Sequence, residues 1–496
     1  MITPINQSQN KPTKTSILYM NDFHAKLPNL ERMYSASKTF DSFETSADKL
    51  KLSSGDDGLG EDPILSRAVS KLLGMIGITK RQNGNHEFDV IPSVHAENAR
   101  TSNYQELGAV NIHAKDTSVL KDTMVRSAVE IHNGNKYGIV GIGPSDMFSR
   151  LKDGVSKDDL IVDDIDTTIV NLQKEVDNLK SQGVNKIFLL SHSGYSNDVE
   201  IAKKTKGIDV ILGGHSHDLI KGVESGKNLF YNSDNEPVVI TQAGKDGEYF
   251  GILNLEFDEN GIIKSVQNNV IPTALFNRPL PAKYAVEQII GKPEHVGVIN
   301  SVPPVPKNRL IENNPHGNFL VDAMRKELGT DIALLNAANI RGSFEKGKID
   351  TRKVSEITPF KNNLVIVKIS EKDLVAAIKL GGKSFVNPGN KPGIVMVSGL
   401  KYTMNDKGEL LSLSYVTDDG KVTPIDINNP NPDKFLRVAM DDFYATGGDG
   451  FHMLNKKHEA EAVYNFDKDK LACDYIKKQN GGVDITDDKR IEIVKA

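Results

Sequence analysis

The chain has 496 residues and a formal net charge of −5; 38% of its residues are hydrophobic and 26% are charged. This length allows two or three domains, with cores large enough to need no disulfide or structural metal. The charge gives no general reason to bind a nucleic acid polymer or an anionic membrane, and no apolar run approaches the ~18 residues of a membrane span. The composition is typical of an ordinary globular protein.

Cys473 is the single cysteine of the chain, which excludes an intramolecular disulfide and a thiolate metal cluster. Any bound metal must therefore use His, Asp, Glu, Asn or Gln. Residues 1–14 are polar and have no apolar signal-peptide core, so we interpret them as a flexible leader. On the sequence as written we expect a cytoplasmic location, unless a signal segment has been removed.

Strand-like and helix-like patterns alternate along the first half of the chain. Amphipathic helices are expected over 63–75 and 164–182. A longer stretch, 238–257, has a strand-like pattern throughout. Short apolar runs predict further strands at 16–20, 50–53, 137–142, 186–191 and 210–212. This alternation indicates helices layered around a mainly central sheet, which is an α/β fold.

A proline-rich stretch separates the two halves of the chain. Its seven prolines stand at positions 272, 279, 281, 293, 303, 304 and 306. We interpret 275–308 as a connector with a short helix at 284–291. The first domain is then 15–274 and the second 309–496. The second domain is expected to hold a helix at 318–328 and strands near 332–335, 364–369, 394–396 and 410–416.

Five polar clusters come directly after apolar strand candidates, and together they hold five of the 12 histidines. The clusters span 21–24, 54–57, 84–89, 191–193 and 213–218. Ligands gather at the carboxyl ends of strands in open α/β sheets. The pairs Asp22/His24 and His215/His217 each direct two side chains to one face of an extended segment, because strand side chains alternate.

These clusters predict a site for two divalent metals. Imidazole and carboxylate ligands suit zinc, manganese, iron or cobalt. Two cations about 4 Å apart repel each other, so a shared carboxylate is expected between them, and Asp56 in its glycine-rich turn is placed for that role. A lone histidine after a strand is more often an ordinary hydrogen-bonded residue, but five such clusters in order favour a metal site.

The ordered motifs Asp-x-His, Gly-Asp, Gly-Asn-His-Glu-Phe-Asp, His and Gly-His-x-His resemble the 5′-nucleotidase family of calcineurin-like metallophosphoesterases. That family includes UDP-sugar hydrolases and 2′,3′-cyclic-nucleotide phosphodiesterases. The resemblance implies a four-layer αββα sandwich, followed by a second α/β domain that binds the nucleotide. It implies a first metal held by Asp22, His24, Asp56 and His217. It implies a second metal held by Asp56, Asn85, His192 and His215.

His86 and Asp89 match the family's catalytic pair, and general chemistry agrees with that role. His86 adjoins the ligand Asn85, so its imidazole can reach the reacting phosphoryl group or the leaving oxygen. Asp89, three residues further on, can orient that imidazole. The alternative for Asp89 is a carboxylate that caps the start of a helix.

Three loop motifs in the second half, at 336–342, 359–363 and 443–451, match the family's substrate-binding motifs. The resemblance implies that Phe360 and Phe443 stack on the base, although both also read as ordinary core residues. The other residues that the match assigns to the substrate are Asn336 and Asn362 for base edges, Arg341 for phosphate or sugar, Asp449 for ribose hydroxyls and Arg309 as a second phosphate arginine.

The expected function is release of phosphate from nucleoside 5′-monophosphates, by in-line attack of a metal-bound hydroxide. Cleavage of UDP-sugars, dinucleotides or 2′,3′-cyclic nucleotides is left open, as is a non-catalytic binding protein on the same scaffold. Two features depart from the family pattern. Lys80-Arg81-Gln82 stands where an apolar strand is usual, which puts the burial of that strand in question. The family is mostly periplasmic or secreted, yet the chain as written has no signal.

Overall fold

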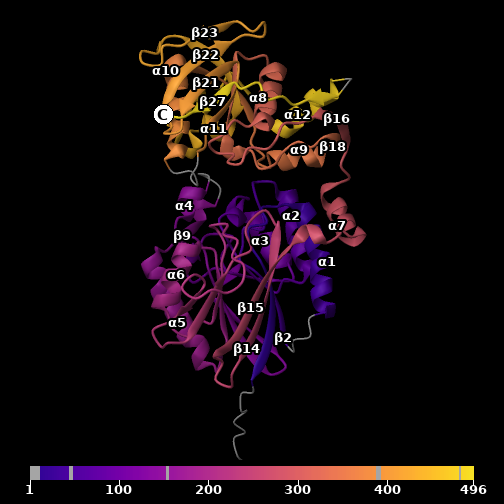
Figure 1. Cartoon of the computed structure of the whole chain (residues 1–496), viewed down its shortest axis with the longest axis vertical. Helices are drawn as coiled ribbons and strands as arrows, with labels where there is room; N and C mark the ends of the chain where they lie inside the picture. Colours follow the sequence, from indigo (N-terminus) through magenta and orange to yellow (C-terminus); the bar gives the residue numbers. More distant parts are fainter. Residues whose placement is uncertain (1–11, 44–47, 152–155, 387–391, 480–481) are drawn as a thin grey trace, which may run out of the picture. The chain divides into compact units, whose positions relative to one another are not determined.

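The computed structural model describes residues 12–43, 48–151, 156–386, 392–479 and 482–496 (Figure 1). The chain divides into two compact units, residues 1–292 and 293–496. Most of the expected leader lies outside the described residues. The expected connector contributes α7 (Leu280–Ile290) to the first unit and β16 (His295–Ser301) to the second. No helix among the described residues is long and apolar enough to cross a membrane.

The first unit contains two large sheets with parallel central strands. One is ordered β15 (Ile263–Pro272), β14 (Tyr249–Phe257), β1 (Thr13–Met20), β2 (Asp48–Ser53), β3 (Lys80–Gln82), β4 (Gln105–Leu107) and β6 (Met124–Val125). The other is ordered β12 (Leu229–Tyr231), β13 (Pro237–Thr241), β11 (Val210–Leu212), β10 (Ile187–Ser191), β8 (Asn135–Ile142) and β7 (Ser127–His132). A short pair joins β5 (Ile112–Ala114) and β9 (Leu160–Val162).

The two large sheets pack face to face, because one buried cluster joins Ile17 and Leu52 of the first sheet to Phe188 and Leu190 of the second. Helices cover the outer faces, with α1 and α2 on one side of the strands and α5 and α6 on the other (Figure 1). The helices of this unit are α1 (Leu27–Phe43), α2 (Pro63–Ile76), α3 (Pro92–Thr101), α4 (Met147–Arg150), α5 (Ile165–Ser181), α6 (Tyr195–Lys204) and α7. The expected four-layer αββα sandwich is confirmed.

Local sequence signals set the ends of these helices. Asp62 caps α2 by accepting from the backbone N–H groups of Ile64 and Leu65, and Gly77 ends the helix in a left-handed conformation. Asp164 caps α5 by accepting from Thr167 N. Helix α7 begins at Leu280, four residues before the expected start, because prolines fit the first turn of a helix.

The expectation that 238–257 is strand-like throughout is wrong for residues 242–248. The stretch forms two strands, β13 and β14, and a loop separates them. Gly244, Asp246 and Gly247 all have positive φ in this loop, a conformation that an extended strand does not use. Its apolar residues belong to the two flanking strands, and the loop carries Asp246 to the candidate metal centre described below.

The second unit has its own core and three sheets. The central sheet is ordered β20 (Val395–Ser398), β17 (Ile332–Asn336), β24 (Phe435–Asp441), β19 (Leu364–Ser370) and β25 (Ala462–Tyr464). The others are β23 (Val422–Pro424), β22 (Leu410–Val416), β21 (Leu400–Asn405) and β27 (Ile491–Val494), and β18 (Gly347–Asp350), β16 and β26 (Val483–Asp484). The helices are α8 (Pro315–Leu328), α9 (Thr351–Ile357), α10 (Glu371–Gly381), α11 (Asp442–Ala445) and α12 (Lys468–Lys477).

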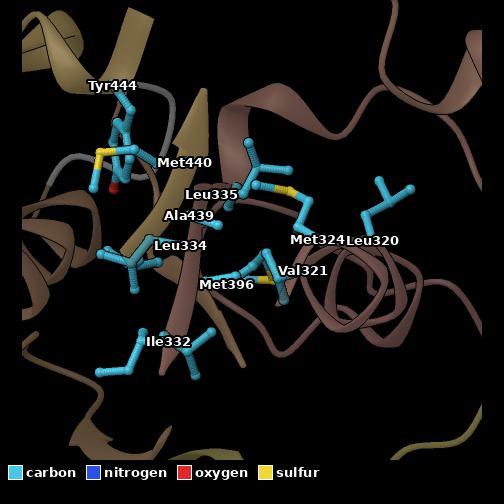
Figure 2. Packing of buried hydrophobic residues seen from close by; sticks show 14 of the residues in the cluster. Leu320, Val321, Met324, Ile332, Leu334, Leu335, Met396, Ala439, Met440 and Tyr444 are labelled. Atoms are coloured by element: carbon cyan, nitrogen blue, oxygen red, sulfur yellow. The ribbon is translucent and has the colours of Figure 1, made fainter. Parts of the chain in front are cut away.

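Helix α8 packs on the central sheet through its apolar face. Figure 2 shows Val321 and Met324 of α8 beside Leu335 of β17 and Met396 of β20, and all four belong to one buried cluster. This core fixes β17 and β24. Asn336 ends β17, and the loops that follow the two strands carry Arg341, Phe443 and Asp449 of the residues expected to bind substrate.

Candidate metal centre and substrate loops

The seven expected metal ligands all follow strands of the two parallel sheet regions. Asp22 and His24 follow β1, Asp56 follows β2 and Asn85 follows β3. The histidines at 192, 215 and 217 come after β10 and β11 of the second sheet. Because the carboxyl ends of neighbouring parallel strands lie at the same edge, the fold gathers these side chains in one place.

Ligand atoms form compact groups at this edge, each with its atoms within 4.8 Å of one another. Asp22 joins His24 and His217, and His217 Nε2 lies 3.3 Å from Asp22 Oδ1. Asp56 joins the histidines at 192 and 215, and its Oδ2 lies 3.1 Å from the Nε2 of residue 192. The same oxygen is 3.8 Å from His24 Nε2, so Asp56 stands between the two groups.

The outer nitrogen of two of these histidines is held by an acceptor. His24 Nδ1 lies 3.0 Å from Asp246 Oδ1, and His192 Nδ1 lies 2.7 Å from the carbonyl oxygen of Ser54. Both acceptors require a proton on Nδ1, which leaves the Nε2 lone pair directed toward the centre. Acceptors of this kind orient metal-bound histidines and raise their basicity.

The donor set fits divalent cations. Asn85 Oδ1 is buried and has no hydrogen-bond partner among the described residues, so a cation would satisfy it. Burial disfavours the charged form of His192, but Asp56 and Asp22 outweigh burial and raise the pKa of this imidazole to about 10. The carboxylates therefore attract positive charge strongly. Nitrogen and oxygen ligands without thiolate suit zinc, manganese, cobalt or iron.

Five of the seven expected ligands have positive φ, which non-glycine residues adopt rarely: Asp22, His24, Asp56, His215 and His217. Such strain persists where the surroundings enforce it, and it concentrates at functional sites. Backbone hydrogen bonds between the two loops enforce it here, from Asp22 N to Gly55 O at 2.8 Å and from His24 N to Asp56 O at 2.9 Å.

Glu87 fastens the loop after β2 to the loop after β3. Its carboxylate accepts from Asp56 N and Gly84 N, both at 2.8 Å, and from Gly58 N at 3.1 Å. Arg81 Nη2 lies 3.0 Å from the same carboxylate, and both side chains are buried. The departure at Lys80-Arg81-Gln82 is thereby explained. The strand is buried, and its arginine neutralises a carboxylate that supports the ligand loops.

His86 lies beside the ligand groups and is oriented by Asp89. Its Nδ1 lies 2.6 Å from Asp89 Oδ2, and its Nε2 lies 4.0 Å from Asp56 Oδ2, so Nε2 faces the centre. The carboxylate of Asp89 also accepts from Gly60 N at 2.9 Å. Its side chain therefore contacts the imidazole and an adjacent loop, and α3 begins at Pro92 without a side-chain cap.

In the second unit, the expected substrate residues come together in two pairs. Asn336 Nδ2 donates to Asp449 Oδ2 at 2.7 Å, and the Arg341 guanidinium lies over the Phe360 ring at 5.3 Å. Arg309 donates from Nη1 to the carbonyl oxygens of Ala338 and Ile340, which places it against the loop after β17 (both 3.3 Å).

The two expected stacking rings are half-buried, and among the described residues they form no ring contact with each other. The core positions of this region are taken by Tyr444 and Phe451, which are fully buried. Phe360 and Phe443 are therefore less buried than these two core rings.

Sequence reasoning missed three supporting residues, Arg81, Glu87 and Asp246. Glu87 lies inside the Gly-Asn-His-Glu-Phe-Asp motif, so its position was a signal. The glycines on either side of Asp246 marked a loop within the strand-like stretch. Arg81 stood out only as a charge in an expected strand.

The chain is similar to known nucleotide-hydrolysing proteins over most of its length. A family model described as the 5′-nucleotidase C-terminal domain matches residues 294–456. A trifunctional nucleotide phosphoesterase protein of Bacillus subtilis is 27% identical over 90% of this chain, and the chain spans 33% of that relative's length. A 5′-nucleotidase of Bos taurus is 26% identical, with 91% of this chain and 86% of the relative covered.

A solved structure gives the same picture. The 5′-nucleotidase precursor from Thermus thermophilus is 25% identical and has a TM-score of 0.78, with 97% of this chain and all of that chain covered. A sulfate thiohydrolase, also from Thermus thermophilus, has a TM-score of 0.69 at 14% identity, which shows likeness of fold alone.

Proposed function

The chain belongs to the 5′-nucleotidase family, and from this premise we propose that it is a dinuclear-metal phosphohydrolase. Its proposed reaction is release of phosphate from nucleoside 5′-monophosphates. The observation that carries the proposal is the position of Asp56, whose carboxylate stands between two ligand groups while His86 Nε2 faces the same point. A shared carboxylate is what two neighbouring cations require.

The residues of the first unit have separate roles in the proposed reaction. Two divalent cations bound by the seven ligands would polarise the phosphoryl group and lower the pKa of a coordinated water. Asp89 accepts a hydrogen bond from His86 Nδ1 and so keeps the proton on that nitrogen. Nε2 is then the nitrogen that contacts the phosphoryl or leaving oxygen and exchanges a proton with it. Glu87 and Arg81 keep the loop of Asp56 in its strained conformation throughout.

The second unit supplies recognition in this proposal. Phe360 and Phe443 stack on the base through their exposed ring surface, and each such contact is worth about 1–3 kcal/mol. Asn336 and Asn362 contact base edges. Asp449 binds ribose hydroxyls, while Arg341 and Arg309 hold phosphate or the nearby sugar.

A substrate panel tests the proposal. Chelator-treated protein is supplied with Mn²⁺, Zn²⁺ or Co²⁺ and given AMP, UDP-glucose or 2′,3′-cyclic AMP. Chromatography then measures the products of each substrate: adenosine and phosphate from AMP, UMP and glucose 1-phosphate from UDP-glucose, and an adenosine 2′- or 3′-monophosphate from the cyclic nucleotide. We expect AMP to be hydrolysed with the highest kcat/KM, and no activity without added metal. A sugar nucleotide or cyclic nucleotide hydrolysed equally well or better would replace the 5′-nucleotidase assignment.

A second candidate keeps the same metal centre and changes the substrate. The Bacillus subtilis relative is named trifunctional, which favours testing cleavage of cyclic nucleotides or of UDP-sugars and dinucleotides alongside monophosphates. A protein that binds metal and nucleotide but hydrolyses none of the panel would instead be a binding protein on this scaffold.

A further inference from the structure

A buried ion pair lies beneath the substrate loops of the second unit. Asp441 ends β24 and Lys468 begins α12, and their side chains are 1% and 0% exposed. Lys468 Nζ lies 3.2 Å from Asp441 Oδ2. Neither residue belongs to the motifs that the family resemblance assigns to the substrate.

Asp441 is bonded to several loops at once. Its Oδ2 accepts from Asn339 Nδ2 at 2.9 Å and lies 3.4 Å from the donating Nδ2 of Asn362, which ties it to the loops after β17 and before β19. Its Oδ1 accepts from Tyr444 N at 2.9 Å, and this bond caps α11, the helix that carries Phe443.

Lys468 completes the arrangement from the opposite side. Its Nζ donates to the carbonyl oxygen of Phe360 at 3.1 Å, so the ammonium holds the backbone of the residue whose ring is expected to stack. Asn339 in turn accepts from Thr358 Oγ1 at 2.8 Å through its Oδ1, a second link to the same segment. Three loops far apart in sequence therefore meet at one ion pair.

The fold itself does not require charges at this place. A buried ion pair must recover the loss of solvation of both groups, and apolar replacement of the whole pair is often neutral or stabilising. Loss of one partner is different, because the other charge is left buried and unpaired. A buried pair whose hydrogen bonds all reach the expected substrate loops indicates a positioning role.

We propose that Asp441 and Lys468 are positioning residues for nucleoside recognition, which set the separation and orientation of Phe360 and Phe443. This inference rests on the proposed nucleotide substrate. Its effect is confined to the bound base, because neither residue belongs to the metal-binding unit.

The test compares two substrates in the metal-loaded enzyme. Lys468→Met, Asp441→Asn and the double variant are assayed with AMP and with p-nitrophenyl phosphate, which has no nucleoside. Lys470→Met is the matched control. Lys470 lies two residues after Lys468 in α12, and its replacement removes an exposed ion pair with Asp474. Thermal unfolding of each variant reports folding.

We expect KM for AMP to rise roughly ten- to a hundredfold in Lys468→Met, with kcat/KM for p-nitrophenyl phosphate within about twofold of wild type. The double variant contains no unpaired charge and should fold like wild type, yet still bind AMP weakly. A merely structural pair predicts normal AMP binding by the folded double variant, and that result would overturn the inference.

Two further outcomes also count against it. Equal loss on both substrates would mean that the pair supports the unit as a whole. A wild-type enzyme whose kcat/KM is no higher for AMP than for p-nitrophenyl phosphate would contradict the proposed function, and the inference with it. The first failure appears only in the variants and the second already in wild type, so the two are distinguishable.

Discussion

The candidate metal centre of the first unit and the expected substrate loops of the second are built in contrasting ways. The expected ligands follow parallel strands, most are buried, and five of the seven have positive φ. Among the seven expected substrate residues, Asp449 alone has positive φ, and both stacking rings are half-exposed. Backbone hydrogen bonds between the loops after β1 and β2 make the first site rigid. The second gains its order from one buried ion pair beneath the loops.

The contrast indicates a division between chemistry and recognition. Metal ligands tolerate little displacement, so strained loops locked by Glu87 and by backbone bonds suit them. A base needs only flat surfaces and a few donors, so half-buried rings on loops suffice. If the division holds, a substitution in one region should impair the function of that region and leave the other unchanged.

The largest effect is expected at His86. Replacement by alanine should lower kcat by about 10²–10⁴-fold, because a positioned proton-transfer group is lost while all seven ligands remain. Metal content by mass spectrometry should stay at the wild-type value. His132→Ala, at a position away from the centre, is the control. Unchanged turnover would remove His86 from the mechanism.

The second largest effect is expected for Asp246, whose replacement should weaken metal binding. Asp246→Ala removes the acceptor on His24 Nδ1, so the affinity of one class of metal site should fall about 10–100-fold, as measured by calorimetry on metal-free protein. Asp246→Asn keeps an oxygen acceptor and should lose less. Asp234→Asn, whose carboxylate pairs with Lys206 elsewhere on the unit, is the control. Wild-type affinity in Asp246→Ala would show that His24 needs no such support.

Phe360→Ala should act on recognition alone. Loss of one stacking surface should raise KM for AMP roughly tenfold and leave p-nitrophenyl phosphate hydrolysis unchanged. Phe435→Ala, an exposed phenylalanine at the start of β24, provides the comparison. Equal loss on both substrates would assign the ring to packing and would break the division between the two regions.

The smallest expected effect concerns a buried carboxylate that forms no ion pair among the described residues. Unlike Asp441, Asp198 of α6 accepts hydrogen bonds from the hydroxyls of Ser191 and Ser193, and burial raises its pKa to about 7. The folded state therefore keeps a proton that the unfolded state releases near pH 4. Asp198 should contribute a fall in stability as pH rises between about 4 and 7, of about 1 kcal/mol from pH 5 to pH 6.

Asp198→Asn should make the slope shallower by this amount, because a neutral amide does not titrate. Burial also raises the pKa of Asp57 and Asp209, so part of the slope should remain. Urea unfolding of the metal-free protein at several pH values measures the slope, and Asp177→Asn on the exposed side of α5 is the control. A slope unchanged from wild type in Asp198→Asn would contradict the prediction.

Much of the fold was predictable from local signals. The strands at 210–212 and 410–416 have the expected bounds, and the helix expected over 63–75 forms as α2, one residue longer. Asp62, Pro63 and Gly77 are short-range start and stop signals, which explains this accuracy. The error over 238–257 arose because apolar runs stand on both sides of residues 242–248 and hid the polar, glycine-containing loop between them. The backbone of that loop is held by Asp22 and Asn29, more than 200 residues away.

The sequence by itself determined an α/β fold, the order of the motifs and the residues to consider for metal and substrate, because alternation, capping and short motifs are written in neighbouring positions. The αββα layering was implied by the resemblance of those motifs to the 5′-nucleotidase family. Their roles stay predictions. Only the tertiary structure decided that Asp56 stands between the two ligand groups, that Asp246 holds His24 and that Asp441 meets Lys468. Those contacts join residues between 27 and 222 positions apart, and such pairing follows from how the strands assemble rather than from any local pattern.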